Sequence, residues 1–273
     1  MKLTDQIAIV TGVGGGLGES ICLCLAEEGA HVVVSDLRLD LAEAVAKKVE
    51  AAGRRAIGVQ TDVRYSDQVK DLMDKALATF GRIDILVCCA WVHEVTLRGE
   101  TEPPGLIENI TEEDWNRTMD INLKGVFLCN RAIAPYFKQQ RRGKIINISS
   151  VAGRVGNEVM PHYCASKAGM NIFTQSVALQ LAPYSVNVNT VCPGMIYTSL
   201  FETRGAKAIA ATYPELRNMA PQEMFDALVQ ARIPMKRPQT GESIGKAVVF
   251  FASSDSREIT GQALNVDGGF VLS

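Results

Sequence analysis

Short apolar segments rich in β-branched residues alternate along the chain with longer segments in which apolar residues recur at helical spacing. The short segments predict strands at residues 7–11, 31–35, 55–60, 83–87, 144–149, 186–191 and 263–266. The longer segments predict helices at residues 18–28, 39–52, 67–80, 112–140, 163–181 and 241–253. Strands that are apolar throughout and alternate with helices are typical of a parallel sheet covered on both faces. We therefore expect an α/β fold, in which residues 1–273 form a single doubly wound Rossmann domain with a seven-stranded parallel sheet.

Polar residues at the helix starts and two long irregular segments refine this prediction. Thr111, followed three residues later by Asp114, predicts a helix start close to a capping box, and Ser66 and Thr240 are predicted N-caps. Segments 91–110 and 195–239 interrupt the alternation, the second with short helical patches. Both are expected to leave the carboxyl ends of strands, where this architecture binds its ligand. We interpret them as lids or pocket walls.

Composition and charge exclude several classes of function. The formal net charge of −2 provides no basic excess for nucleic acid, so no nucleic-acid partner is expected. The sequence has neither a signal-peptide pattern nor an apolar run of membrane-spanning length, which predicts a cytoplasmic protein without a membrane partner. Seven cysteines, an odd number, argue against a disulfide framework, and the three dispersed histidines indicate no metal site.

A glycine-rich turn, Thr11–Gly18, lies between the first predicted strand and the first predicted helix. Glycine permits the positive φ angles of such a turn and the close approach of backbone to a phosphate group. The start of the helix offers free N–H groups and the positive end of its dipole to a pyrophosphate. A merely flexible turn is the alternative, but the position between strand and helix favours dinucleotide binding by residues Gly12, Gly15, Gly16, Leu17 and Gly18.

Acidic residues follow the second and third predicted strands. Asp36 lies about 20 residues after the turn, where a carboxylate accepts hydrogen bonds from the adenosine ribose and repels the 2′-phosphate of NADP. The turn has no basic residue, so we predict NAD as the cofactor. Arg38, two residues after Asp36, could reduce the preference for NAD over NADP. An ordinary helix-capping Asp is the alternative for Asp36. Asp62 and Val63 are candidates to contact the adenine, and Asp62 by itself is no more than a loop Asp.

Tyr163 and Lys167 form the single Tyr-x-x-x-Lys pattern of the chain. On a helix these residues share one face, and an ammonium near a phenol lowers the phenol pKa from about 10, as a general acid/base requires. A surface helix pair is the alternative. Ser150 ends a buried strand thirteen residues before Tyr163 and is expected to meet it above the sheet. Asn122 is an amide in an apolar helix, for which a core asparagine and a functional residue are equally good interpretations.

These motifs together resemble the short-chain dehydrogenase/reductase family, in its ordinary rather than extended branch. The resemblance covers essentially the whole chain. It rests on the cofactor turn Thr11-Gly12-x-x-x-Gly16-x-Gly18, the strand 81–87, the loop 193–198, and the final motifs 260–262 and 267–269. It rests also on the order and spacing of four residues that match the catalytic tetrad of the family. It implies that the catalytic residues are Asn122, Ser150, Tyr163 and Lys167.

The resemblance also implies a mechanism and an assembly. Tyr163 would exchange a proton with an alcohol or ketone, Ser150 would hold the substrate oxygen, and Asn122 would fix a water that links Lys167 to solvent. Lys167 would lower the Tyr163 pKa and hold the nicotinamide ribose, and hydride would pass directly to or from the nicotinamide. A homotetramer, or a homodimer, is implied. Further implied cofactor contacts are Cys89, Ala90, Tyr163, Lys167, Pro193, Gly194, Ile196 and Thr198.

One segment departs from the family pattern. The family commonly has Asn-Asn-Ala-Gly after the fourth strand, whereas this chain has Cys88-Cys89-Ala90-Trp91. Cysteine replaces the structural hydrogen bonds of asparagine poorly, and an indole changes the close approach that glycine allows. We hypothesise that Trp91 helps to wall the active-site mouth and contacts substrate. Core packing under the following loop is an equally good interpretation.

The substrate pocket is expected to draw on segments 150–155, 160–162, 195–201 and 91–110. Ser150 and Tyr197 are predicted substrate contacts, and Val151, Val155, Met160, Leu200 and Phe201 would make the pocket partly apolar. Three arginines could meet an anionic group, although solvated surface positions suit them better: Arg98, Arg154 and Arg204. The prediction is an NAD-dependent oxidoreductase of a small-molecule alcohol or ketone. The alternatives are a non-catalytic NAD-binding scaffold or sensor and an isomerase or dehydratase that uses NAD transiently.

Overall fold

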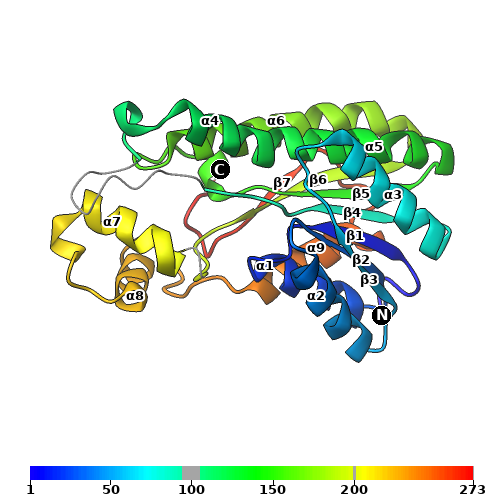
Figure 1. Ribbon diagram of the computed structural model, residues 1–273, viewed down its shortest axis with the longest axis horizontal. Helices are drawn as coiled ribbons and strands as arrows, with labels where there is room; N and C mark the ends of the chain where they lie inside the picture. The colour runs from blue at the N-terminus through cyan, green and yellow to red at the C-terminus, as the bar shows by residue number, and fades with distance from the viewer. Residues whose placement is uncertain (94–104, 199–200, 273) are drawn as a thin grey trace.

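The computed structural model describes residues 1–93, 105–198 and 201–272, and its centre is a seven-stranded sheet. All strands are parallel, and their order is β3-β2-β1-β4-β5-β6-β7 (Figure 1). The strands are β1 Ile7–Thr11, β2 His31–Asp36, β3 Ala56–Gln60, β4 Ile85–Cys88, β5 Gly143–Ile148, β6 Val186–Pro193 and β7 Ala263–Val266. The predicted α/β fold with a seven-stranded parallel sheet is therefore confirmed.

Helices cover both faces of the sheet. Helices α1 (Leu17–Glu27), α2 (Leu39–Ala51) and α9 (Gly241–Ala252) pack on one face, below the strands in Figure 1. Helices α3 (Ser66–Phe80), α5 (Gly125–Gln140) and α6 (Pro161–Leu181) pack on the other face, above the strands. This layering explains why the strands are apolar throughout.

The first strand illustrates how both faces contribute to the core. Ala8 and Val10 point into the layer of α1, α2 and α9, whereas Ile9 points into the layer of α3, α5 and α6. All three side chains are fully buried. Full burial of a valine or isoleucine side chain contributes about 1.5–3 kcal/mol, so burial of Val10 and Ile9 on opposite faces stabilises this strand in the centre of the sheet.

The predicted helix 112–140 is interrupted. The structure has α4 from Glu112 to Met119, a π-helical turn η2 from Asp120 to Lys124, and then α5. A π turn accommodates one extra residue within an otherwise continuous helix, so the apolar periodicity does not reveal it. Such turns occur frequently at functional sites, and this one carries the candidate residue Asn122.

Two of the three predicted helix caps are confirmed. The Thr111 hydroxyl accepts from the Asp114 N–H at 3.0 Å, while the Asp114 carboxylate accepts from the Thr111 N–H at 3.3 Å. Thr240 caps α9 by accepting from the Ser243 N–H at 3.1 Å. The prediction for Ser66 is wrong, because α3 already includes this residue and Tyr65 occupies the cap position.

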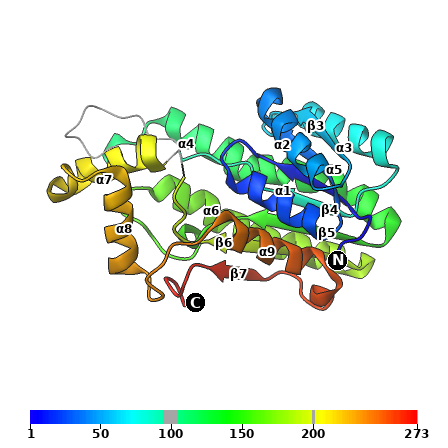
Figure 2. The same ribbon diagram turned by 90° about the horizontal axis from the view of Figure 1, so that it is seen from below.

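The segment after β6 forms a small helical lobe beside the sheet. It contains the π turn η5 (Phe201–Gly205), α7 (Ala206–Thr212) and α8 (Pro221–Arg232), which stand apart from the helices that flank the sheet in both views (Figures 1 and 2). Phe225, Val229 and Ile233 form its buried centre. The short helical patches predicted in 195–239 correspond to these helices.

A helix that spans a membrane must be both long and apolar. Within the described ranges, no helix has both the length and the apolar character needed to cross a membrane.

The two capping predictions generate a stability test. Thr111→Ala should lower the free energy of unfolding by about 1 kcal/mol, because it leaves the Asp114 N–H without its cap, whereas Thr111→Ser should retain most of it. Ser66→Ala should change it by less than about 0.5 kcal/mol, because Ser66 is an exposed first-turn residue. Urea unfolding of the three variants measures these differences. Equal losses for Thr111→Ala and Ser66→Ala would contradict the assignment of the caps.

Candidate active site

The glycine turn is packed against the segment that follows β4. Gly12 has a φ of +77°, and a Cβ at this position would lie 2.3 Å from the Ala90 Cα. Its N–H donates to the Ser35 carbonyl at 2.7 Å. Only glycine fits both this conformation and this spacing. The turn, the end of β2 and the chain after β4 are therefore held at one point of the sheet edge.

The outer side of the same turn is open. No atom of the described residues lies within 4 Å of the positions that Cβ atoms would take at Gly15 and Gly16. Leu17 and Gly18 begin α1, whose first N–H groups have no side-chain cap. An open glycine edge over a helix start is the shape that a pyrophosphate requires. These residues fit the predicted dinucleotide, which would lie across the turn.

Asp36 ends β2 beside this turn. Its carboxylate accepts from the Gly14 N–H at 2.8 Å and from the Arg38 N–H at 3.0 Å, and the side chain is partly exposed. The Arg38 guanidinium instead pairs with Asp40. Asp36 is thus fixed by the backbone on both sides while its charge stays near the turn, and Arg38 is engaged with another carboxylate.

Asp62 follows β3 and lies beside a second cavity of about 370 Å³ that Leu37 and Gln60 also line. Burial would raise the pKa of Asp62, but hydrogen bonds from Arg64 and its charge bring that pKa below the ordinary value. The adjacent Val63 is buried against Gly125, where a Cβ would lie 2.8 Å from the Val63 side chain. The location suits an adenine contact, which stays a prediction for both residues.

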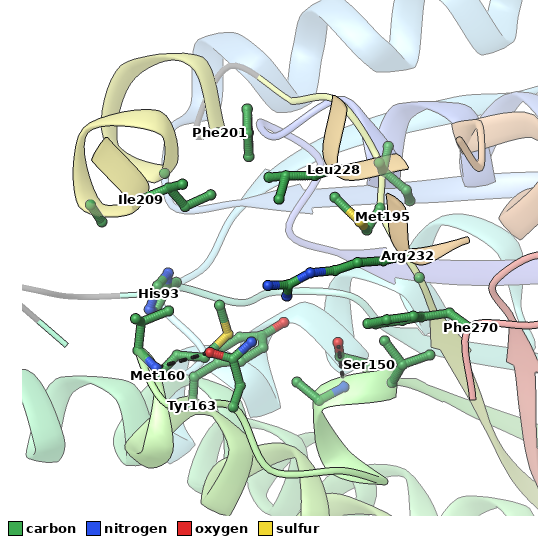
Figure 3. A pocket seen from close by; sticks show the side chains of 18 of the residues that line it. His93, Ser150, Met160, Tyr163, Met195, Phe201, Ile209, Leu228, Arg232 and Phe270 are labelled. Carbon is green, nitrogen blue, oxygen red and sulfur yellow. Dashed lines mark hydrogen bonds between the residues drawn. The ribbon is translucent and has the colours of Figure 1, made fainter. Parts of the chain in front are cut away.

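Tyr163 and Lys167 lie on one face of α6, as predicted, and both are buried. The Lys167 Nζ lies 5.6 Å from the centre of the Tyr163 ring and donates to the Ile148 carbonyl at 2.9 Å. The Ser150 side chain interacts with the Tyr163 hydroxyl and accepts from the Ala152 N–H at 3.1 Å. Figure 3 shows the Tyr163 and Ser150 hydroxyls side by side at the cavity. The structure thus brings these three candidates together.

The protonation of this group differs from the simple expectation. Burial raises the pKa of Tyr163 well above its ordinary value, and the hydrogen bond with Ser150 only partly opposes this rise. Burial also lowers the pKa of Lys167 to about 8. The expected lowering of the Tyr163 pKa by Lys167 is not found here, because desolvation of the phenol is the largest influence and raises that pKa. Tyr163 is protonated at neutral pH in this environment.

Asn122 is fully buried on the π turn η2 and is joined to the chain after β4. Its Oδ1 accepts from the Val92 N–H at 2.8 Å, and its Nδ2 donates to the Val92 carbonyl at 2.9 Å and the Ser166 hydroxyl at 3.2 Å. Both interpretations of Asn122, a core asparagine and a residue that serves the site, therefore apply in part. It is a satisfied buried amide, and it fixes the segment that carries Trp91. Its implied link to a water stays a prediction.

The altered Cys88–Trp91 segment retains its structural hydrogen bonds by other means. The Cys89 N–H donates to the Thr11 carbonyl at 3.1 Å, and Asn130, which lies 3.6 Å from the Cys88 sulfur, donates to Asn147 at 3.1 Å. Both thiols are buried, and burial raises the pKa of Cys89 to about 12. These cysteines are therefore neutral packing residues. Sequence reasoning missed Asn130 and Asn147, two polar residues whose place among apolar neighbours was the available signal.

The side chains that follow Ala90 form one wall beside Tyr163. The Trp91 ring centre lies 6.1 Å from that of Tyr163, edge to face, and the His93 ring centre lies 5.5 Å from it. Trp91 is half-buried and lines the cavity, so it both packs and walls the mouth. Burial and the neighbouring His162 lower the pKa of His93 to about 4, so His93 is neutral. Sequence reasoning missed His93 because an isolated histidine carries no pattern.

The loop after β6 closes the other side of the site. The Gly194 N–H donates to the Val266 carbonyl at 3.1 Å, and a Cβ on Gly194 would lie 2.5 Å from the Gln239 side chain. Pro193 ends β6, and Ile196 and Thr198 line the cavity. Gly194, Ile196 and Thr198 therefore line the same cavity as Ser150, and their implied nicotinamide contacts stay a prediction.

The cavity between these walls has a volume of about 340 Å³. Side chains of the helical lobe form its far wall (Figure 3). Of the residues in the predicted pocket segments, these line it: Trp91, His93, Ser150, Val151, Ala152, Val155, Met160, Met195, Ile196, Thr198 and Phe201. Leu200 and Arg98 lie outside the described residues, and the side chain of Arg204 is likewise not described.

The predicted substrate contact Tyr197 is not among the described residues that line the cavity, and neither is Arg154, for which a surface position was the preferred interpretation. The Tyr197 ring packs against Phe201 and Phe225, at 5.8 and 5.2 Å between ring centres, and is not one of the described lining residues. Arg154 donates to the Ala263 carbonyl at 2.7 Å and so holds the backbone of β7. In contrast, Arg232 at the end of α8 lines the cavity and was not predicted. No cluster of metal-ligating side chains is found within the described ranges.

Comparison with known proteins agrees with this geometry. The model of the short chain dehydrogenase family matches residues 6–208. The chain is 37% identical over 272 residues to a 3-oxoacyl-[acyl-carrier-protein] reductase of Synechocystis sp., covering 99% of this chain and 98% of that protein. It is 32% identical to the enzyme of that name from Thermotoga maritima, covering 100% of both chains.

Solved structures agree as well. An NAD+-bound xylitol dehydrogenase superposes with a TM-score of 0.88 at 28% identity, covering 98% of this chain and 100% of that one. A putative short-chain alcohol dehydrogenase from Sinorhizobium meliloti superposes with a TM-score of 0.85 at 29% identity, covering 98% and 97%. The chain therefore belongs to the short-chain dehydrogenase family, a class of oxidoreductases that bind a nicotinamide cofactor and act on small molecules.

The position of Trp91 generates a prediction about substrate binding. Trp91→Ala should raise the KM for substrate roughly three- to tenfold, because an aromatic contact contributes about 0.5–1.5 kcal/mol. The exposed Trp115 on α4 provides the matched control, since Trp115→Ala removes an indole away from the cavity. Steady-state kinetics and thermal unfolding separate the two interpretations. A large loss of stability with unchanged KM would assign Trp91 to core packing alone.

Proposed function

We propose that this protein is an NAD-dependent oxidoreductase that transfers a hydride between nicotinamide and a secondary alcohol or ketone. The observation that carries the proposal is the pair of hydroxyls from Tyr163 and Ser150 at the cavity, with Lys167 buried behind them. The open glycine turn, and the loop 193–198 from which Gly194, Ile196 and Thr198 line the cavity, support the proposal of a bound dinucleotide. NAD supplies or accepts the hydride when bound.

The residues of the tetrad have separate tasks in this proposal. Ser150 holds the substrate oxygen by a hydrogen bond, and Tyr163 donates a proton to that oxygen in reduction or accepts one in oxidation. Lys167, tied to the Ile148 carbonyl, holds its ammonium under the Tyr163 ring and stabilises the phenolate when it forms. Asn122 holds the Val92 backbone and with it the wall that carries Trp91.

The protonation of Tyr163 supports activity as a ketone reductase at neutral pH. A raised pKa keeps the phenol protonated, which is the form that donates a proton. Oxidation requires the phenolate, whose fraction rises with pH until the folded pKa is passed. The reverse reaction is therefore favoured by alkaline conditions.

The choice of NAD is supported by the charges around Asp36. A carboxylate fixed beside the turn accepts from ribose hydroxyls and repels a 2′-phosphate. Arg38, the nearest cation in sequence, is engaged with Asp40. One structural neighbour, the xylitol dehydrogenase, is an NAD+-bound form.

The alternatives lack an observation that favours them. A non-catalytic scaffold would not need the buried Lys167 beneath Tyr163, because an unused buried ammonium costs stability. An isomerase or dehydratase would give no net change in NADH. Reduction of a 3-oxoacyl thioester, as the names of the relatives suggest, falls within the proposed ketone chemistry.

We also propose a cytoplasmic homotetramer. The surface of α5 and α6 exposes large apolar side chains, among them Phe127, Ile172 at 62% and Leu179 at 79%. Exposed apolar side chains of this size on neighbouring helices support a subunit interface there. A homodimer through the same helices is the smaller form of the same proposal.

The role of Tyr163 is tested by removing one oxygen atom. Tyr163→Phe should reduce kcat by about 10²–10⁴-fold, because the proton donor is lost, while the affinity for NADH remains. Tyr184→Phe removes a hydroxyl away from the cavity and is the matched control. Ketone reduction is followed by NADH absorbance, and cofactor binding by NADH fluorescence. A Tyr163→Phe variant with near-normal turnover would refute the assignment.

The cofactor preference is tested at Asp36. The native protein should use NADH with at least about tenfold higher kcat/KM than NADPH, and Asp36→Ser should reduce this ratio strongly because it removes the like-charge repulsion. Asp74→Asn, which removes a carboxylate on the surface of α3, is the control. Equal or better efficiency of the native protein with NADPH would contradict the prediction.

A further inference from the structure

We infer that Arg232 forms an anion-binding subsite in the catalytic cavity and that the substrate is an oxo or hydroxy acid whose carboxylate binds there. This inference rests on the proposed function and specifies its substrate class. In the set of described lining residues, Arg232 is the only one with a permanent charge. Two other arginines are not part of this lining: Arg154 donates to the Ala263 carbonyl, and Arg217 is not among the described lining residues.

Arg232 is directed into the cavity rather than away from it. Figure 3 shows its side chain extending across the space, with Leu228 and Ile209 on one side and Met160 and Tyr163 on the other. The reacting hydroxyls of Tyr163 and Ser150 lie across the same space from the lobe that carries it. A ligand whose reacting carbon rests on Tyr163 therefore has a guanidinium within the same cavity.

A contact from Tyr213 holds Arg232 in this direction. The Tyr213 hydroxyl donates to the Glu158 carboxylate and also interacts with the Arg232 guanidinium. A phenol oxygen that donates its single proton to Glu158 offers only its lone pairs to Arg232. Because a guanidinium has five N–H donors, this contact uses a minority of them. The remaining donors are available to a ligand.

The kind of anion follows from the geometry of arginine and from the nearby charge. A planar guanidinium matches a carboxylate through two parallel hydrogen bonds. Glu158 carries a negative charge on the far side of Tyr213, so the local net charge is close to zero before a ligand binds. A monoanion is favoured over a dianion by this balance, which selects a carboxylate over a phosphate monoester.

The body of the ligand follows from the walls between the two polar ends. Val155, Met160, Ile209 and Leu228 present hydrocarbon to the cavity. Its volume of about 340 Å³ must also admit the edge of the nicotinamide, which leaves space for a small ligand. A short aliphatic chain with a ketone near one end and a carboxylate at the other satisfies these constraints.

The test uses straight-chain methyl ketones, from oxopentanoate to oxoheptanoate, each as the free acid and as its methyl ester. With the native protein and NADH, at least one acid should have a KM roughly ten- to a hundredfold below that of its ester, as expected for a hydrogen-bonded ion pair. Arg232→Met should remove this difference by raising the KM of the acid, with kcat retained. Arg232→Lys should restore part of it, and Arg217→Met should leave it intact.

Two results would overturn the inference. One is an equal KM for acid and ester throughout the series in the native protein, and the other is an equal effect of Arg232→Met on both. Thermal unfolding checks that each Arg232 variant is folded. If Arg232→Met does not fold, Arg232→Lys takes its place in the comparison of acid and ester.

Binding separates this inference from the proposed function. The Tyr163→Phe variant loaded with NADH is titrated with the oxo acids by calorimetry. NADH binding followed by acid binding that needs Arg232 supports the subsite even without turnover. NADH binding without acid binding overturns the subsite alone. Absence of NADH binding in both the native protein and the variant overturns the proposed function itself.

Discussion

The active centre depends on one hydrogen bond, from the buried Lys167 ammonium to the Ile148 carbonyl. An ammonium removed from water is costly unless a partner is supplied, and the end of β5 supplies it. The bond fixes the start of α6 against the sheet edge, and thereby sets Tyr163 beside Ser150. The Ser149 hydroxyl, which donates to the Lys167 carbonyl at 3.0 Å, adds a second link between the same two elements.

Sequence patterns were sufficient for the fold and for the group formed by Ser150, Tyr163 and Lys167. Apolar runs such as β1 and β2 identify buried parallel strands, because both of their faces contact helices. Tyr163 and Lys167 were predictable because helical spacing places them on one face. Ser66 failed as a cap because a suitable residue type near a helix start does not determine where the first turn begins.

Contacts made only in three dimensions were beyond prediction. Arg232 reaches the cavity through the packing of α8 on its lobe, about 70 residues after Tyr163, and no spacing rule connects them. The raised pKa of Tyr163 depends on its burial, which a sequence motif does not measure. The surroundings of Cys88 were not predictable either, because the hydrogen bond between Asn130 and Asn147 beside it joins residues that are distant in sequence.

The π turn at 120–124 makes the length of this helix part of the site. Because the π turn accommodates one extra residue, removing a residue here would restore regular α-helical geometry and tighten the turn that carries Asn122. Asn122 would then leave the Val92 backbone that it holds from both sides. Substitutions that preserve the π turn leave the site in place, whereas a single-residue deletion that removes the turn does not. The register of the helix is therefore as much a determinant of activity as any side chain on it.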